Sequence, residues 1–202
     1  EAAIYHQAFP TTKVEVVYGS TEAEPISSIN VKELVKEQAD LVSKGLNVGV
    51  PYRKTAVKVI QITDEILECE NEVALEKLEI PKGEIGEIIV SGSHVLREYF
   101  NNEAALKRNK IFFGNDCWHR TGDSGYLGEN GSLYLTGRCN TLIKINKKVV
   151  APFIYESYFQ SLKGVEMGTI LQKNHQILII LELNDPTQKA AITQAVKSLN
   201  FP

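Results

Sequence analysis

The sequence predicts an α+β fold, with a small antiparallel barrel or open sheet followed by a second, smaller α/β unit. Three observations carry this prediction. Short segments with strand character recur up to residue 136 and are separated by turn signals. One of those signals, Asn130-Gly131, strongly favours a β-hairpin. After Gly137 the pattern changes to strand, helix, two strands and helix, which indicates a separate unit.

Apolar periodicity predicts the elements of the first half of the chain. Helices are expected over residues 2–9 and 30–43, and strands over residues 14–17, 54–62 and 86–90. The first of these strands feeds into an expected turn at Tyr18-Gly19. Residues 64–80 are acidic and indicate no particular element.

Turn and cap residues organise the second half. An asparagine caps an expected helix over residues 101–110, and Asn130-Gly131 joins two short expected strands. The expected elements are strands over residues 124–127, 132–136, 141–145, 165–171 and 176–183, and helices over residues 152–162 and 186–199. Pro152 and Pro186 occupy first-turn positions, where proline is tolerated. The apolar run at residues 177–181 predicts a buried strand.

Composition narrows the class of protein. The 202 residues suit one or two domains, and 43% of them are hydrophobic. A balance of 22 basic against 25 acidic side chains, with a net charge of -3, predicts no nucleic-acid partner. Three widely spaced cysteines exclude a disulfide framework and fit a reducing compartment. With neither a signal-peptide pattern nor a transmembrane segment in this sequence, we predict a cytoplasmic protein.

Two blocks in the second half suggest a binding site for a sugar or nucleotide. Asp123 stands in Arg120-Thr121-Gly122-Asp123-Ser124-Gly125, where a glycine-bracketed turn is expected. Its carboxylate could accept hydrogen bonds from two vicinal hydroxyls, such as those of a ribose. Arg138 follows in Gly137-Arg138, and its planar guanidinium could hold the same sugar. Either block alone equally describes a surface turn, so the pair and its order carry the hypothesis.

The two blocks, in this order, resemble the adenylate-forming superfamily, which includes acyl- and aryl-CoA synthetases, fatty acyl-AMP ligases, luciferases and peptide-synthetase adenylation domains. Ile143-Lys144, Pro152 and Glu156 follow at the expected places. Further matches are Tyr18-Gly19-Ser20-Thr21-Glu22, and Gly83-Glu84-Ile85-Gly86-Glu87-Ile88 with Ser91-Gly92 behind it. The resemblance spans roughly residues 14–160.

The resemblance implies how the chain is divided. Residues 1–137 would be the C-terminal part of a large adenylation core, including a distorted antiparallel β-barrel. Residues 138–140 would be a hinge, and residues 141–202 part of a small α/β C-terminal lid domain. The family's phosphate loop would lie before residue 1 and its catalytic lysine beyond residue 202. We therefore expect a C-terminal fragment that is inactive alone.

The resemblance also implies a reaction. An AMP-forming acid–thiol ligase uses ATP and Mg²⁺ to activate a carboxylic acid as acyl-AMP, then passes the acyl group to a thiol such as CoA or an acyl carrier protein. The sequence after Glu22 is similar to a long-chain-acyl subgroup, which favours a fatty acid. A glycine that lets the CoA chain pass is usual near position 147, where Lys147-Lys148 stand here. This departure leaves CoA and a carrier protein equally open as acceptors.

Residue roles follow from the matched positions. In the Tyr18–Glu22 block, Tyr18 would stack on adenine, with Gly19 and Ser20 beside the nucleotide. Thr21 would donate a hydrogen bond to the α-phosphate, and Glu22 would hold magnesium; these two form the expected catalytic pair. The other expected nucleotide contacts are Asp123 on the ribose hydroxyls, Arg138 beside the same sugar, and Lys144 after the hinge.

Several readings stay open. The swivel residue is Asn140 instead of the usual Asp or Lys, and the resemblance assigns only structural roles to Trp118 and His119. The chain could instead be a non-catalytic adenylate-binding or scaffolding module, or residues 1–137 could be a β-rich interaction domain. The ligase hypothesis requires that Glu22 and Asp123 face one shared cleft.

Overall fold

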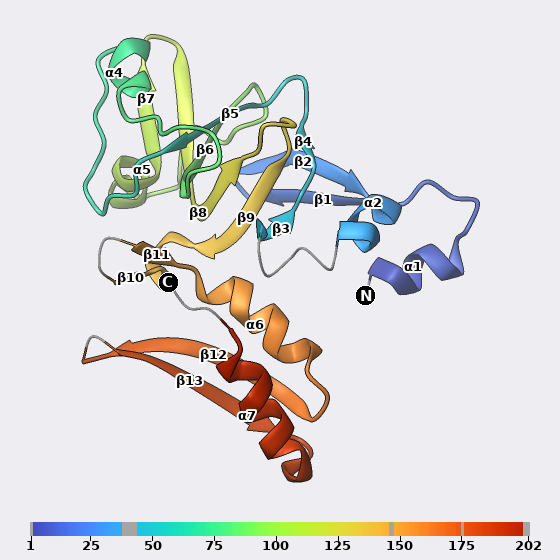
Figure 1. Cartoon of the computed structure of the whole chain (residues 1–202). Coiled ribbons are helices and arrows are strands. Elements are labelled where there is room, and N and C mark those ends of the chain that lie inside the picture. Colours follow the sequence, from blue (N-terminus) through green and yellow to red (C-terminus); the bar gives the residue numbers. More distant parts are fainter. Residues whose placement is uncertain (1, 38–43, 146–147, 175, 200–202) are drawn as a thin grey trace.

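The computed structural model describes residues 2–37, 44–145, 148–174 and 176–199. They form a mixed α/β fold with an open, curled antiparallel sheet. The predicted combination of helices with an antiparallel sheet is confirmed. Figure 1 shows the β-rich part of the chain above a smaller unit. The elements of that unit are α6 (Pro152–Ser161), β12 (Val165–Lys173), β13 (Gln176–Leu183) and α7 (Lys189–Lys197).

The largest sheet is antiparallel throughout and contains the Arg120–Gly125 block. Its strands, in sheet order, are β3 (Leu46–Asn47), β9 (Leu133–Arg138), β8 (Asp116–Leu127), β6 (Gly86–Ser91) and β5 (Ala56–Ile60). A further strand, β7 (Lys110–Phe113), pairs with the first part of β8 on the edge opposite β6. Because β3 and β5 lie at its two edges, the sheet is open along this path. The distorted barrel therefore stays a prediction.

The second sheet contains most of the Tyr18–Glu22 block. It consists of β1 (Glu15–Ser20), β2 (Ala23–Asn30) and β4 (Val50–Pro51). The expected turn at Tyr18-Gly19 is wrong, because β1 continues through a bulge to Ser20 and turns only at Thr21-Glu22. A core that includes Ile26, Val48 and Ile88 joins this sheet to the first.

Short helices flank the sheets. They are α1 (Ala2–Ala8), α2 (Val31–Lys36), α4 (Glu72–Glu76) and α5 (Glu103–Asn109). The expected asparagine cap is confirmed, since Asn102 Oδ1 accepts from the Ala105 N–H at 3.0 Å at the start of α5. The helix predicted over residues 30–43 is seen as α2, and residues 38–43 lie outside the described ranges. Within those ranges, no helix is long and apolar enough to cross a membrane.

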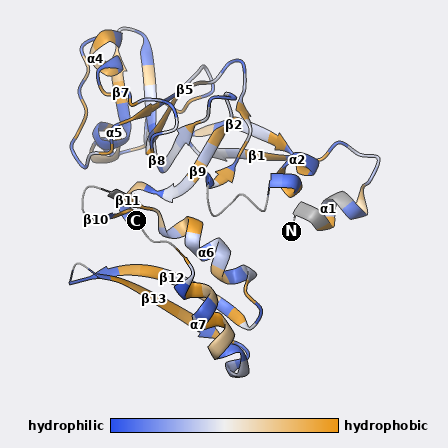
Figure 2. Cartoon of the chain, viewed as in Figure 1, coloured by the Kyte–Doolittle hydropathy of each residue, from blue (hydrophilic) through white to orange (hydrophobic). Residues whose placement is uncertain are grey.

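The elements after Gly137 follow the predicted order, with one additional strand over residues 148–150. After η2 (Cys139–Thr141), the strands β10 (Ile143–Ile145) and β11 (Lys148–Val150) pair, and η3 (Pro186–Gln188) precedes α7. The strand expected from residue 141 thus begins two residues later, and the last helix begins as a 3₁₀ turn. A separate core includes Phe159, Ile170 and Ile192, and Figure 2 shows the apolar character of β12 and β13.

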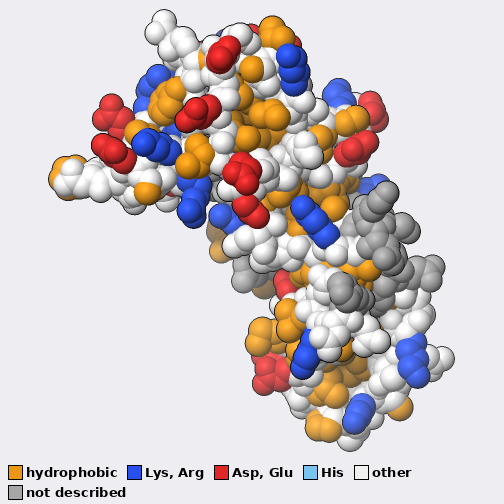
Figure 3. All heavy atoms as spheres, turned by 90° about the vertical axis from the view of Figure 1, so that its left-hand side faces the viewer, with side chains coloured by type: hydrophobic (Ala, Val, Ile, Leu, Met, Phe, Trp, Pro, Cys, Tyr) orange, Lys and Arg blue, Asp and Glu red, His pale blue; other side chains and the backbone are white. Residues whose placement is uncertain are grey.

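The prediction that residues 177–181 are buried is wrong for alternate residues. Leu178 is 38% exposed and Ile180 is 51% exposed, whereas their neighbours in β13 are half-buried. α6 packs against β12, and β13 contributes alternate side chains to the shared core, so the other face of this two-stranded hairpin stays exposed. Figure 3 shows apolar side chains at the surface of this lower unit, below a region where acidic and basic side chains are interspersed.

Asp123 does not lie on a turn, contrary to expectation. Thr121, Gly122 and Asp123 form a bulge inside the long strand β8, because Arg120 pairs with Ile89 whereas Ser124 pairs with Glu87. Gly122 has a φ of 70°, a conformation that glycine adopts at low cost. The two short arms of the expected hairpin are parts of longer strands, β8 and β9.

A buried ion pair ties the neighbouring loop to the sheet. Arg120 Nη2 donates to Glu87 Oε2 at 2.6 Å, and both side chains are less than a tenth exposed. The same guanidinium donates to the backbone carbonyls of Thr63 at 2.6 Å and Glu65 at 2.8 Å. The segment after β5 is therefore held against β6 and β8 by one charged side chain.

We predict that Arg120→Met lowers the free energy of unfolding by about 3–5 kcal/mol, because it leaves the Glu87 carboxylate buried without its counter-ion. Urea unfolding followed by circular dichroism measures the change. Lys13→Met is the control, since Lys13 pairs with Glu15 at the surface and its side chain is 74% exposed. Equal unfolding midpoints for the two variants would contradict the prediction.

Candidate functional site

A cleft of about 540 Å³ opens where the two sheets, α5 and η2 approach one another. The turn after β1 contributes Ser20 and Glu22, and β8 contributes the segment His119–Gly122. Arg138 and Asn140 close the side nearest the smaller unit. The Tyr18–Glu22 block and the Arg120–Gly125 block therefore meet at one cavity, although a hundred residues separate them.

Asp123 is held from two sides beside this cleft. The Tyr18 hydroxyl donates to Asp123 Oδ2 at 2.7 Å, and Arg138 Nη1 donates to Oδ1 at 2.7 Å. Asp123 and Arg138 are paired residues of β8 and β9, and Arg138 also donates to the Thr121 carbonyl at 3.1 Å. A carboxylate has about four lone-pair sites, so two acceptor positions remain for a ligand.

Tyr18 is a neutral hydrogen-bond donor in this arrangement. Burial, followed by the charge of Asp123 and the hydrogen bond to it, raises the pKa of Tyr18 well above its usual range. The ring packs against the core that joins the two sheets. The residue expected to stack on adenine is thus also a fixed support for the Asp123 carboxylate.

A second group of side chains surrounds Glu22. The Tyr99 hydroxyl donates to Glu22 Oε1 at 3.1 Å, and His119 Nε2 lies 3.9 Å from Oε2. Asn109 supports both neighbours, since its Nδ2 donates to the Tyr99 oxygen at 3.4 Å and its carbonyl lies 3.2 Å from His119 Nδ1. The buried Nζ of Lys110 lies 5.5 Å from the centre of the Tyr99 ring. These contacts fix the position of the Glu22 carboxylate.

The titration of this group follows from its surroundings. Burial works to raise the pKa of Glu22, but hydrogen bonds from its own backbone N–H and from Tyr99 outweigh burial and lower the pKa. Burial lowers the pKa of His119 to about 4, so its ring is neutral at pH 7. Burial also raises the pKa of the Cys139 thiol to about 12, which makes this cleft residue a poor nucleophile.

Three of the predicted site residues line the cleft: Ser20, Glu22 and Arg138. Tyr18 and Asp123 are not among the lining residues; Arg138 donates to Asp123, which also accepts from Tyr18. Gly19 lies in β1 beside Tyr18, and Thr21 is exposed at the turn that follows.

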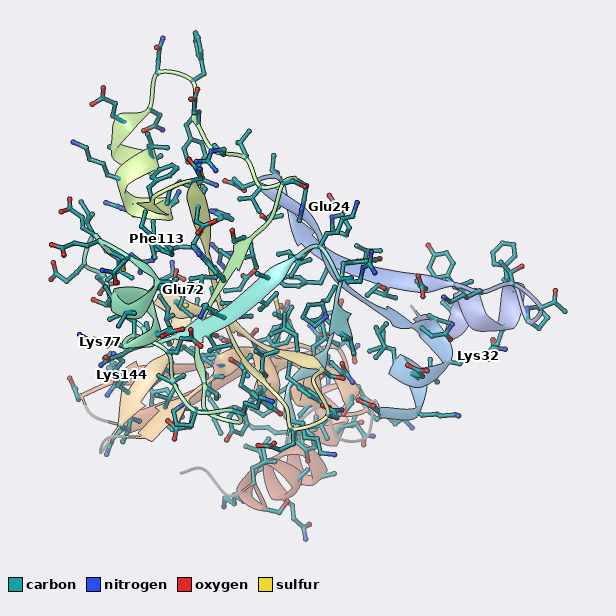
Figure 4. All side chains as sticks on the ribbon, turned by 90° about the horizontal axis from the view of Figure 1, so that it is seen from above. Glu24, Lys32, Glu72, Lys77, Phe113 and Lys144 are labelled. Atoms are coloured by element: carbon teal, nitrogen blue, oxygen red, sulfur yellow. The ribbon has the colours of Figure 1, made fainter. Side chains whose placement is uncertain are left out.

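Lys144 is not part of this assembly. It lies exposed on β10, and Figure 4 shows it far from Glu24 at the end of the β1–β2 hairpin. The cleft-lining residues do not include it.

Sequence reasoning missed Tyr99 and Lys110 and assigned His119 a structural role only. His119 had a weak signal, since it stands two residues before Thr121 and a strand presents alternate residues on one face. Tyr99 had none, because it reaches Glu22 from the segment between β6 and α5, 77 residues further along the chain. Lys110 had none either, because it is placed by the pairing of β7 with β8. Among the described residues, no group of three or more His, Cys, Asp or Glu side chains could hold a metal ion.

Known proteins resemble the chain over most of its length. No protein-family model matches it. It is 33% identical over 149 residues to a putative acyl-CoA ligase of Bacillus subtilis, which covers 73% of this chain and 25% of that protein. Identity to 4-coumarate:CoA ligase 1 of Petunia hybrida is 29%, over 71% of this chain and 23% of that protein. Identity to the D-alanine–D-alanyl carrier protein ligase of Bacillus licheniformis is 28%, over 69% and 24%.

A solved structure shares the fold. The O-succinylbenzoate coenzyme A synthetase of Bacillus subtilis, in complex with AMP, matches 98% of this chain and 37% of its own chain, with a TM-score of 0.70 and 24% identity. Compared with the three ligases named in the preceding paragraph, the chain spans about a quarter of their length.

The buried neutral state of His119 predicts a pH dependence of stability. The unfolded chain protonates this ring below about pH 6.5, whereas the folded chain does so only near pH 4. Stability from this residue is therefore complete above pH 6.5 and is lost as the pH falls towards 4, by up to about 3 kcal/mol. We expect urea unfolding to show wild type losing stability relative to His119→Gln over this range. Parallel pH profiles would contradict the prediction.

Proposed function

Because the chain is homologous to the adenylate-forming ligases and matches the C-terminal part of that family, we propose that it supplies the ribose- and metal-binding side of an ATP-dependent ligase site. The whole enzyme would activate a carboxylic acid as acyl-AMP, release pyrophosphate, and pass the acyl group to a thiol. The names of the relatives support both CoA and a carrier protein as the acceptor.

One observation carries the proposal: Asp123 is held between Tyr18 and Arg138, and it directly follows Gly122, which lines the cleft together with Arg138. Its two remaining acceptor positions suit the two vicinal hydroxyls of a ribose. The side chain of Arg138 is 59% exposed, so it can change conformation to contact a bound nucleotide. The partly buried Tyr18 keeps the Asp123 carboxylate in place. A ribose would therefore meet an oriented acceptor, and little ordering would be needed on binding.

The metal-binding side of the proposal rests on Glu22. Mg²⁺ is commonly bound by one or two carboxylates together with phosphate oxygens and waters, so the Glu22 carboxylate fits it. When bound, Mg²⁺ would neutralise charge on the phosphates of ATP. The Tyr99 hydroxyl donates to one oxygen of Glu22, and the other oxygen lies 3.9 Å from His119 Nε2 without a hydrogen bond to it. Thr21, exposed at the tip of the same turn, would offer its hydroxyl to the α-phosphate.

The division into two units is part of the proposal. We propose residues 1–137 as the end of the adenylation core, residues 138–140 as the hinge and residues 141–202 as part of the lid. The separate core around Phe159 supports this division, and η2 is a short connection at the proposed hinge. Lys147, expected to crowd a CoA passage, lies outside the described residues.

The acid is proposed only as a carboxylic acid, with a fatty acid as the candidate from the sequence after Glu22. The relatives are named for acids as different as 4-coumarate and D-alanine. The test is pyrophosphate release by the full-length protein with ATP, Mg²⁺ and a panel of aliphatic and aromatic acids, with and without CoA. Release that depends on one class of acid supports the ligase, and release with none of them contradicts it.

We predict that Asp123→Ala weakens AMP binding at least tenfold, because the ribose loses its acceptor, a change of about 1–3 kcal/mol. Isothermal titration calorimetry compares AMP with 2′,3′-dideoxy-AMP, which lacks both hydroxyls. Wild type should prefer AMP, and Asp123→Ala should bind both weakly and equally. Asp116→Ala is the matched control, since Asp116 is an exposed carboxylate at the far end of the same strand. An unchanged preference for AMP in Asp123→Ala would refute the ribose role.

A further inference from the structure

We propose that His119 Nε2 is a second metal ligand beside Glu22, so that the cleft holds a divalent transition-metal ion such as Mn²⁺. The inference rests on the metal role of Glu22 in the proposed function and goes beyond it, because an oxygen-only Mg²⁺ site would need no histidine. Four observations on the chain support it.

The first observation is the tautomer of His119. Its Nδ1 lies 3.2 Å from the backbone carbonyl of Asn109. A carbonyl oxygen only accepts, so Nδ1 carries the hydrogen and the neutral ring presents a lone pair at Nε2. Histidines that bind metal ions commonly donate their other N–H to a backbone carbonyl in this way. His119 is therefore oriented as a ligand.

The second observation is the distance between the two candidate ligand atoms. His119 Nε2 and Glu22 Oε2 lie 3.9 Å apart, which is too far for a hydrogen bond. Two ligands at about 2.1 Å from one ion can be up to about 4.2 Å apart, so a single ion can contact both with a small movement. Without a cation or a donated proton between them, two lone pairs would face each other.

The third observation is that one residue supports both ligands. The Asn109 carbonyl holds His119, and its side-chain amide holds the Tyr99 hydroxyl that binds the other oxygen of Glu22. His119 is only 3% exposed, so its ring has little freedom to turn. Such outer contacts fix ligand direction before an ion arrives.

The fourth observation concerns an unsatisfied oxygen in the same cleft wall. Ser20 Oγ is buried and has no hydrogen-bond partner among the described residues. A buried hydroxyl without a partner is costly, and a water bound to a metal ion could satisfy it. The remaining ligand positions would be filled by water or by phosphate oxygens, because no group of three or more His, Cys, Asp or Glu side chains among the described residues could hold the ion.

Lys110 opposes the site and provides a sharp control. Its ammonium is buried near Glu22, above the Tyr99 ring, and repels a second cation. Replacing that charge should therefore strengthen metal binding, whereas removing the imidazole should weaken it. A general loss of structure could not produce these two opposite changes. Imidazole nitrogen suits transition metals such as Zn²⁺, Fe²⁺ or Ni²⁺, whereas Mg²⁺ prefers oxygen ligands; Mn²⁺ serves here as the spectroscopic probe.

The experiment titrates the chain with Mn²⁺ alone, without nucleotide, and follows free Mn²⁺ by electron paramagnetic resonance. Pulsed measurements then report whether a ¹⁴N nucleus couples to the bound ion. We expect one bound Mn²⁺ with imidazole ¹⁴N coupling in wild type. His119→Gln should lose the coupling and bind at least tenfold more weakly, Glu22→Gln should bind equally weakly, and Lys110→Met should bind more tightly with the coupling intact.

Wild type that binds no Mn²⁺, or binds it without ¹⁴N coupling, would overturn the proposal. So would equal affinity in wild type and His119→Gln. Tyr99→Phe covers the case in which His119→Gln fails to fold, because it removes only a hydroxyl; it should weaken binding while the coupling persists. Asp123→Ala separates this site from the proposed function, since it should keep Mn²⁺ binding and lose the preference for AMP.

Discussion

The bulge at Gly122 is the constraint on which the site depends. It places three residues of β8 opposite one residue of β6, so that Arg120 reaches the buried Glu87 while Asp123 reaches Tyr18 and Arg138. A Cβ on Gly122 would lie 2.8 Å from Arg138 Nη2, and the backbone there has a φ of 70°. The backbone conformation favours glycine, whereas the exposed end of Arg138 could move aside for a Cβ.

Two arginine–carboxylate pairs flank this bulge and serve different purposes. Arg120 and Glu87 are buried, and the guanidinium is also held by backbone carbonyls, so the pair organises the loop after β5. Arg138 and Asp123 are equally close, but the arginine is largely exposed. An exposed pair contributes little to stability and can rearrange, which suits a pair that meets a ligand.

Sequence patterns predicted what depends on local chemistry. The asparagine cap of α5, the Asn130-Gly131 hairpin and the order of elements after Gly137 all follow from residues close in the chain. The meeting of the Tyr18 and Asp123 blocks came from the resemblance and not from periodicity. The bulge at Gly122 could not be predicted, because a glycine-bracketed carboxylate suits a turn equally well. The contacts around Glu22 join it to Tyr99 and His119, which are far along the chain and have no local signature.

The distribution of the cores has a consequence for how the molecule denatures. Ile88 and Val90 of β6 face one core and Ile89 faces another, so those two cores share their strands and should melt together. The core around Phe159 draws only on residues after Leu142 and shares no strand with them. Heating should therefore release the C-terminal unit in a transition of its own, and a calorimetric trace of this chain should not fit a single cooperative step.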